Sequence, residues 1–164
     1  MIKQSFLNKL KKEGRLALVE PSEEVKTSYL RKADNCLESA RVLLDKKLYE
    51  NSVINSYYAM YNSVTALLFK AGIKSENHGA TIAFLEELFG ETELSKIIGE
   101  AKSERIDKQY YAEDKSEKPV TEGFTKEMAN TAEKFLVRMK VLINKISNKE
   151  IDDIREKFEA LFSK

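Results

Sequence analysis

The sequence is poor in the side chains that build most metal and redox sites. It contains one cysteine, Cys36, and one histidine, His78. A single cysteine excludes an intramolecular disulfide and a cysteine-based metal site. A single histidine excludes a zinc site built on a histidine pair and a relay of two histidines. We therefore expect no metal and no cofactor, and we find no Ser-His-Asp or Cys-His triad and no glycine-rich phosphate loop.

Glycine and proline are also scarce, at 6 and 2 of 164 residues. Folds with many tight turns need both residues, so this scarcity disfavours a many-stranded sandwich or barrel. The length suits one domain, and we expect residues 1–164 to form it.

An excess of charge of one sign is missing as well. The chain has 28 basic and 27 acidic residues, a net charge of +1. This balance excludes the strongly cationic class of nucleic-acid binders and the polyacidic disordered class. No segment carries a basic stripe, so we expect no binding to long DNA.

Long apolar runs are absent too. Residues 1–14 are lysine-rich and amphipathic, unlike a secretory signal. Residues 51–69 carry no charge and are long enough to span a bilayer. Seven of these residues are Asn, Ser or Thr, however, and each would need a partner in lipid. We therefore expect a soluble cytoplasmic protein without a membrane segment, in which residues 51–69 form a central helix covered mostly by protein.

The sequence is rich in helical periodicity. Apolar residues recur at steps of three and four in a series of stretches, and sustained two-residue alternation is missing, so we expect helices and no strand. The predicted fold class is all-α: an antiparallel up-and-down bundle of four or five helices, with short extra helices at both termini. The periodic stretches are 27–48, 50–71, 82–89, 92–111, 121–146 and 151–161.

Breaks in the pattern agree with this division. Ser22 follows Pro21 and is a candidate N-cap for the first long helix. Residues 112–120 are rich in charge and carry Pro119 near their end. This composition predicts the longest exposed loop of the chain. Ser147 and Glu150 have the spacing of a capping box, which predicts an appended C-terminal helix over about 149–162.

Polar residues of the uncharged helix fall on defined faces. Asn51, Asn55, Tyr58 and Asn62 step by four, three and four, so they share one face. Three serines at 52, 56 and 63 lie on the adjacent face, where small side chains permit close helix packing. Two interpretations remain open: a buried packing or dimer seam, and the floor of a polar pocket.

Arg105 is in helical phase with apolar residues. At 100° per residue it lies on the same stripe as Ile98 and Ala101, which directs it toward the core. The planar guanidinium of Arg105 can bind a carboxylate or a phosphate in the core. Alternatively, the side chain extends to the end of the bundle and reaches solvent there. Tyr110 follows about one turn later, at an angle that can face a neighbouring helix.

His78 lies at the start of a predicted helix, where the helix dipole disfavours the imidazolium. A neutral imidazole there can act as a base or bind phosphate. The alternative is a loop histidine that closes a turn with Asn77.

Three blocks of residues together resemble a known family. Residues 13–16 and the leading helix form the first block, residues 55–61 followed by Gly72, His78 and Gly79 form the second, and Arg105 followed by Tyr110 begins the third. The chain resembles the HEPN domain (higher eukaryotes and prokaryotes nucleotide-binding), in particular its small stand-alone prokaryotic subgroup. The resemblance spans about residues 13–146.

The resemblance implies a HEPN-like bundle, usually dimeric, and often a toxin–antitoxin pairing with a minimal nucleotidyltransferase. Other members are metal-independent endoribonucleases with an Arg-x(4–6)-His motif. If His78 is the histidine of this motif, the arginine must stand at position 71, 72 or 73. These positions hold Ala, Gly and Ile, so this chain departs from the motif. The resemblance instead implies one site made of Tyr57, Tyr58, His78, Arg105 and Tyr110.

Three functional hypotheses follow. The first is a non-catalytic nucleotide- or RNA-binding module, a homodimer that works with a nucleotidyltransferase partner. The second is a divergent metal-independent endoribonuclease, with His78 and Arg105 as catalytic residues across a dimer. The third is a structural dimerisation or interaction protein. For the first hypothesis the expected ligand-binding residues are Tyr57, Tyr58, Asn62, His78, Arg105 and Tyr110.

Overall fold

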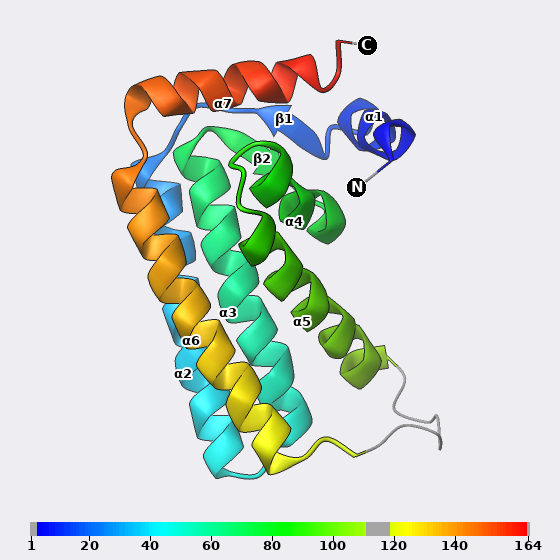
Figure 1. Cartoon of the computed structure of the whole chain (residues 1–164), viewed down its shortest axis with the longest axis vertical. Coiled ribbons are helices and arrows are strands. Elements are labelled where there is room, and N and C mark those ends of the chain that lie inside the picture. Colours follow the sequence, from blue (N-terminus) through cyan, green and yellow to red (C-terminus); the bar gives the residue numbers. More distant parts are fainter. Residues whose placement is uncertain (1–2, 111–118, 164) are drawn as a thin grey trace.

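The computed structural model describes residues 3–110 and 119–163, and for residues 106–110 it describes the backbone only. The predicted loop at 112–120 therefore lies almost wholly outside the described residues. The elements, labelled in Figure 1, are α1 (Gln4–Lys12), β1 (Leu16–Leu18), α2 (Glu23–Asp45), α3 (Tyr49–Lys70), β2 (Ile73–Ser75), α4 (His78–Glu87), α5 (Thr92–Tyr110), α6 (Glu122–Lys145) and α7 (Asn148–Ala160).

Four long helices form the body of the molecule. In Figure 1, α2, α3, α5 and α6 run alternately down and up the long axis, with α5 inclined to the others. Their apolar stripes meet in one core, because residues three and four apart project from the same side of a helix. The predicted all-α up-and-down bundle is confirmed. Central members of this core are Val53, Tyr57 and Met60 of α3, Leu94 and Ile98 of α5, and Phe135 and Met139 of α6.

The expectation of no strand is wrong in one place. Residues 16–18 (β1) and 73–75 (β2) pair as a small antiparallel sheet, with Leu16 opposite Ser75 and Leu18 opposite Ile73. Three residues are too few to show a two-residue alternation, and the pairing joins segments far apart in the sequence. The sheet buries Leu16 and Ile73 at the end of the bundle.

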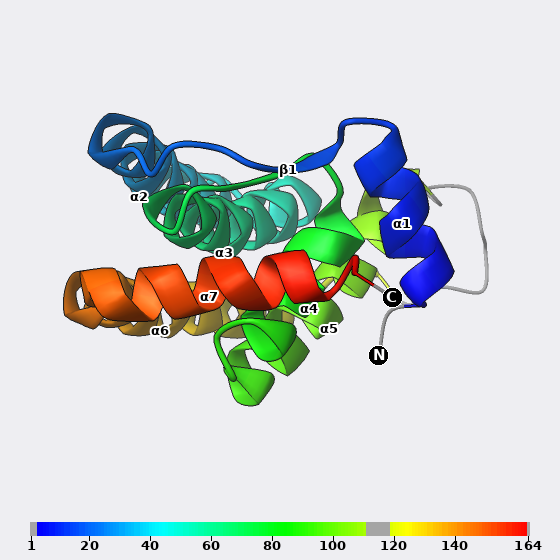
Figure 2. The ribbon, with the colours of Figure 1, turned by 90° about the horizontal axis from the view of Figure 1, so that it is seen from above.

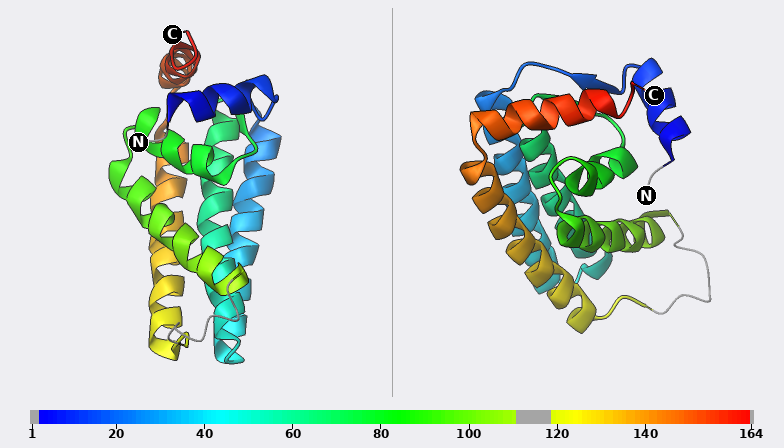
Figure 3. Two further views of the ribbon diagram at one scale, coloured as in Figure 1. Left: turned by 90° about the vertical axis from the view of Figure 1, so that its right-hand side faces the viewer. Right: turned by 45° about the horizontal axis from the view of Figure 1, so that its top comes forward.

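A second layer covers that end of the bundle. Figures 2 and 3 show α1, α4 and α7 gathered there with the two strands, and α7 crossing over the ends of the long helices. The Phe84 and Phe158 rings meet edge to face, with centroids 5.6 Å apart. The layer has its own apolar cluster, which includes Leu7, Leu10, Leu16, Ile73, Phe84, Leu88, Ile154 and Phe158.

Two predicted helix caps are confirmed. The Ser22 hydroxyl accepts a 3.1 Å hydrogen bond from the backbone N–H of Val25 at the start of α2. Ser147 and Glu150 form the reciprocal capping box that starts α7. These side chains satisfy backbone donors that the first turn of a helix leaves unpaired.

Arg155 of α7 fastens this helix to the bundle. Its Nη1 donates to the carbonyl oxygens of Val19, Ala71 and Gly72, at 2.8, 3.2 and 2.9 Å. Gly72 has a φ of 69°, in the left-handed region that favours glycine. One guanidinium thus joins α7 to the segment after β1 and to the turn between α3 and β2.

The central helix is α3, as its lack of charge predicts. Most of its residues are buried, and α2, α5 and α6 pack around it. The Ser52 hydroxyl donates a 2.6 Å hydrogen bond to the Ala40 carbonyl of α2, so the small residues do permit close packing. Within the described residues, no helix combines the length and apolar character needed to cross a bilayer.

Candidate functional site

The candidate site lies where α3 meets the first turn of α4. Tyr57 is fully buried on α3, and its hydroxyl lies 2.6 Å from Nδ1 of His78. The imidazole stacks on the ring of Tyr61, with centroids 4.0 Å apart and planes 8° from parallel. The histidine ring is therefore fixed by a hydrogen bond at one edge and by an aromatic face at its side.

Arg105 of α5 completes this group. Its side chain is in the core, with 8% of the residue exposed, and Nη1 donates a 2.9 Å hydrogen bond to the Tyr58 hydroxyl. Its Cζ lies 5.2 Å from the ring centroid of Tyr57 and 5.6 Å from that of Tyr58. Both distances are within the range of a cation–π interaction. The alternative that Arg105 extends to the end of the bundle is wrong.

We call Tyr57, Tyr58, Tyr61, His78 and Arg105 the tyrosine–histidine–arginine cluster. Three of its members come from one helix, α3, and the other two from α4 and α5. The spacing of Tyr57, Tyr58 and Tyr61 brings the three rings to one region of α3, because residues three and four apart are neighbours on a helix.

The start of α4 is shaped by its cap. Asn77 is the N-cap, and its side-chain oxygen accepts a 3.0 Å hydrogen bond from the backbone N–H of Ala80. His78 is therefore the first residue of the helix and not a loop residue. Gly79 follows, and a Cβ built there would lie 3.8 Å from Nζ of Lys102 on α5. A second cation thus lies beside the cluster.

The surroundings keep the imidazole neutral. Burial lowers the pKa of His78 to about 4, and the positive charges of Arg105 and Lys102 act in the same direction. Burial raises the pKa of Tyr57 above its ordinary value, although the charge of Arg105 opposes that rise. At neutral pH the cluster therefore combines an uncharged imidazole, the protonated phenol of Tyr57 and the guanidinium of Arg105.

Four of the six residues expected to bind a ligand come together here: Tyr57, Tyr58, His78 and Arg105. Asn62 is elsewhere, since its Nδ2 lies 3.6 Å from Sγ of Cys36 on α2. The side chain of Tyr110 lies outside the described residues; its backbone ends α5.

Sequence reasoning did not include Tyr61 in the site. The signal was present, because Tyr61 follows Tyr57 by four positions and Tyr58 by three, so the three residues form one patch on a helix. Tyr61 packs against the bundle core, and one face of its ring stacks on the imidazole of His78.

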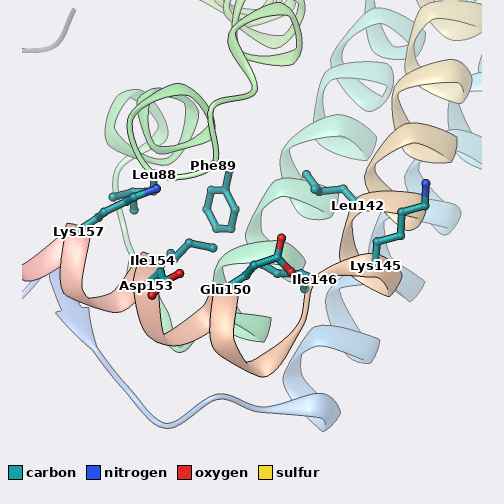
Figure 4. A pocket seen from close by; sticks show the side chains of 9 residues that line it. All are labelled: Leu88, Phe89, Leu142, Lys145, Ile146, Glu150, Asp153, Ile154 and Lys157. Carbon is teal, nitrogen blue, oxygen red and sulfur yellow. The ribbon is translucent and has the colours of Figure 1, made fainter.

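A separate cavity of about 210 Å³ lies under α7 (Figure 4). Figure 4 shows its apolar side chains between the end of α4, the end of α6 and α7, with lysine and carboxylate side chains around them. It holds no tyrosine, histidine or arginine and is not part of the cluster. The lining residues are Leu88, Phe89, Leu142, Lys145, Ile146, Glu150, Asp153, Ile154 and Lys157.

Among residues 3–105 and 119–163, no group of three or more His, Cys, Asp and Glu side chains is arranged to hold a metal ion. The side chains of the cluster themselves offer three kinds of contact. A guanidinium binds oxyanions, an imidazole donates or accepts one hydrogen bond, and tyrosine rings offer faces for stacking.

Known proteins resemble this chain over 47% to 87% of its length. The protein named "Putative toxin MJ0605" of Methanocaldococcus jannaschii is 28% identical over 144 residues, which are 87% of this chain and 98% of that protein. A UPF0332 protein of Archaeoglobus fulgidus is 28% identical over 116 residues, 71% of this chain and 93% of its own. A UPF0332 protein of Thermotoga maritima is 30% identical over 78 residues, 47% of this chain and 59% of its own.

The family comparison covers the bundle and its C-terminal helix. The model of the HEPN domain matches residues 27–161, from the second turn of α2 to the end of α7. This range includes every residue of the tyrosine–histidine–arginine cluster. The chain belongs to the HEPN domain family.

Proposed function

We propose that this protein is a toxin–antitoxin-type HEPN module whose tyrosine–histidine–arginine cluster binds a nucleotide or a short RNA without cleaving it. The observation that carries the proposal is the buried guanidinium of Arg105, held over two tyrosine rings beside a neutral histidine. The name of the Methanocaldococcus relative supports the toxin-type role. The absence of a membrane-spanning helix among the described residues is compatible with action in the cytoplasm.

The chemistry of Arg105 favours a phosphate. Its guanidinium is buried beside the rings of Tyr57 and Tyr58, and a guanidinium has five N–H donors and no acceptor. The guanidinium fork matches two phosphate oxygens at once, and such charge-assisted pairs are among the strongest hydrogen bonds in proteins. The nearby ammonium of Lys102 adds a second positive charge.

The aromatic members favour a ligand that also carries a base. Tyr58 and Tyr61 are only partly buried, unlike Tyr57. Nucleobases stack on tyrosine rings in a sequence-tolerant manner, and each stack contributes about 1–3 kcal/mol. The near-zero net charge favours a short ligand, because long nucleic acids are bound through many basic residues.

A thermal-shift screen tests the proposal. The purified protein is heated with each nucleoside 5′-monophosphate and triphosphate and with short single-stranded RNAs, and we expect at least one to raise the melting temperature. Arg105→Ala should abolish that rise. Arg138→Ala is the matched control, since Arg138 is exposed on α6 and pairs with Glu93. A wild-type protein that shows no shift with any of these ligands contradicts the proposal.

One observation favours the endoribonuclease as a second candidate. A neutral imidazole and a guanidinium contact the same tyrosine, Tyr57, within one chain. In a metal-independent ribonuclease these groups would move a proton and stabilise the charge on the phosphate. Cleavage of RNA in the presence of a chelator, lost in His78→Ala, would support it. Cleavage that survives His78→Ala eliminates this role for the histidine.

We further propose a homodimer through the uncharged face of α3. Asn51 is exposed, and Asn55, Tyr58 and Asn62 are partly exposed along this helix. A face without charge loses little on desolvation and can be covered by a second copy. Light scattering of Asn55→Arg tests this: we expect monomers where the wild type is dimeric. An unchanged oligomer would show that this face is not the seam.

The partner that we propose for this module is a minimal nucleotidyltransferase, as in the toxin–antitoxin pairs of the family that it resembles. A gene for such an enzyme beside this one would support the pairing. Co-expression of the two proteins, followed by affinity purification of one, then tests the complex directly. If the two proteins separate completely at micromolar concentration, the proposed partner is wrong.

A further inference from the structure

The hydrogen bond between Tyr57 and His78 carries information about where the imidazole proton lies. The Tyr57 oxygen and Nδ1 of His78 are 2.6 Å apart, a short distance for a hydrogen bond. Either the phenol donates to an unprotonated Nδ1, or a protonated Nδ1 donates to the phenol oxygen. A neutral imidazole carries one proton, so this choice also decides the state of Nε2.

The burial of Tyr57 decides between the two arrangements. The residue is fully buried, and its hydroxyl hydrogen needs an acceptor because an unpaired buried donor is costly. Within the described part of the chain, the only hydrogen-bond partner of this hydroxyl is Nδ1 of His78. Arg105, the charged neighbour over the ring, offers donors and no acceptor. The phenol proton must therefore point at Nδ1.

We infer that Tyr57 is a positioning residue that holds His78 as the Nε2–H tautomer, so that the cluster presents a hydrogen-bond donor to its ligand and not a base. The stack on Tyr61 holds the ring plane, and the bond from Tyr57 holds its rotation. Nε2 then lies on the side of the ring away from Tyr57. The histidine is only partly buried, and no described residue forms a hydrogen bond with its Nε2.

The tautomer of His78 also limits the chemical class of the ligand. This step rests on the proposed function, that the cluster binds a nucleotide or a short RNA. Nε2–H of His78 then adds a hydrogen-bond donor beside two cations, the guanidinium of Arg105 and the ammonium of Lys102. They match an acceptor-only anionic oxygen, that of a phosphate. They do not match a 2′-hydroxyl that must lose its proton, so the tautomer favours binding over nucleophile activation by this histidine.

The single histidine makes the test direct. Protein with ¹⁵N-labelled histidine, free of ligand at pH 7, gives one imidazole spin system in a long-range ¹H–¹⁵N correlation spectrum. We expect an unprotonated Nδ1 and a protonated Nε2. In Tyr57→Phe both nitrogen shifts should move toward the exchange average of a free imidazole. Tyr61→Phe is the matched control: it keeps the stacked ring, removes a different hydroxyl and should leave the tautomer as in the wild type.

Two results would overturn the inference. One is a proton on Nδ1 of the wild-type protein, and the other is a Tyr57→Phe spectrum with the wild-type nitrogen shifts. Both are read without ligand, so they are distinct from a failure of the proposed function, which the nucleotide and RNA screen reports. The wild-type spectrum decides the tautomer even if Tyr57→Phe does not fold.

Discussion

The guanidinium of Arg105 donates a 2.9 Å hydrogen bond to the hydroxyl of Tyr58, a residue 47 positions earlier in the chain. This contact joins α5 to α3 in the interior of the bundle. It holds the guanidinium over the ring of Tyr57. The hydroxyl of that tyrosine in turn contacts His78. The position of the cation thus depends on an aromatic hydroxyl and two ring faces.

A double-mutant cycle on Arg105 and Tyr58 should reveal this dependence. Tyr58→Phe removes the acceptor and should cost about 1 kcal/mol, and Arg105→Met removes the donor with a side chain of similar length. Because the two groups contact each other, we expect a coupling of about 0.5–3 kcal/mol between the single changes. Urea unfolding of the four proteins measures it. Free energies of unfolding that add within about 0.3 kcal/mol would contradict the contact.

Local features of the site were predictable from the sequence, whereas most contacts between helices were not. The phase of Arg105 predicts its burial, and the Ser147–Glu150 spacing predicts the start of α7, because both depend only on helix geometry. The sequence also places His78 at the start of a helix, and α4 begins at this residue. The Asn77 cap determines that start, and it lies before the apolar pattern begins.

Asn62 shows why a shared helical face does not imply a shared site. It lies one turn after Tyr58 on α3, yet it contacts Cys36 of α2 while Tyr58 contacts Arg105 of α5. The periodicity specifies the direction in which a Cβ points, but the neighbour that is reached depends on side-chain length and on the arrangement of the helices. The small sheet was missed for the same reason, since its partner strand comes from a distant segment.

Two serines on α3 should respond differently to replacement by alanine. Ser52 and Ser56 are both fully buried, but only Ser52 donates a hydrogen bond, to the Ala40 carbonyl. The Ser56 hydroxyl has no hydrogen-bond partner among the described residues. Ser52→Ala should cost about 1 kcal/mol. Ser56→Ala should be neutral or stabilise by up to about 1 kcal/mol, since an unpaired buried hydroxyl is removed. Similar losses of unfolding free energy in both variants would contradict this difference.

Gly72 should tolerate no side chain. Its φ of 69° is left-handed, and a Cβ there would overlap Nη1 of Arg155 and lie 2.5 Å from the Val19 carbonyl oxygen. Gly72→Ala should therefore displace Arg155 and cost about 2–4 kcal/mol. Gly90→Ala is the matched control, since Gly90 has a φ of 72° and open space around it. It should cost only about 1 kcal/mol, for the backbone conformation. Equal melting temperatures of the two variants would contradict the contribution of Arg155.

The histidine should make the protein less stable in acid. Burial and two nearby cations lower the pKa of His78 to about 4 from an ordinary value of 6.5. Between these values the unfolded chain binds a proton that the folded protein does not, so the free energy of unfolding rises with pH from about 4 to 6.5. The pKa values of the adjacent Tyr57 and Tyr61 are raised by burial, so neither phenol titrates in this range.

Replacement of His78 by glutamine isolates this effect. Three carboxyls with lowered pKa values, those of Glu23, Glu76 and Glu150, also destabilise the fold in acid, but they act mainly below pH 4.5 and are present in both proteins. After allowance for the partial exposure of the imidazole, wild type should lose about 1–2 kcal/mol more than His78→Gln between pH 6.5 and pH 4.5. Urea unfolding across this range measures the difference. Parallel curves for the two proteins would mean that the imidazole is free to take up a proton in the fold, and the donor role of a neutral His78 would then fail with it.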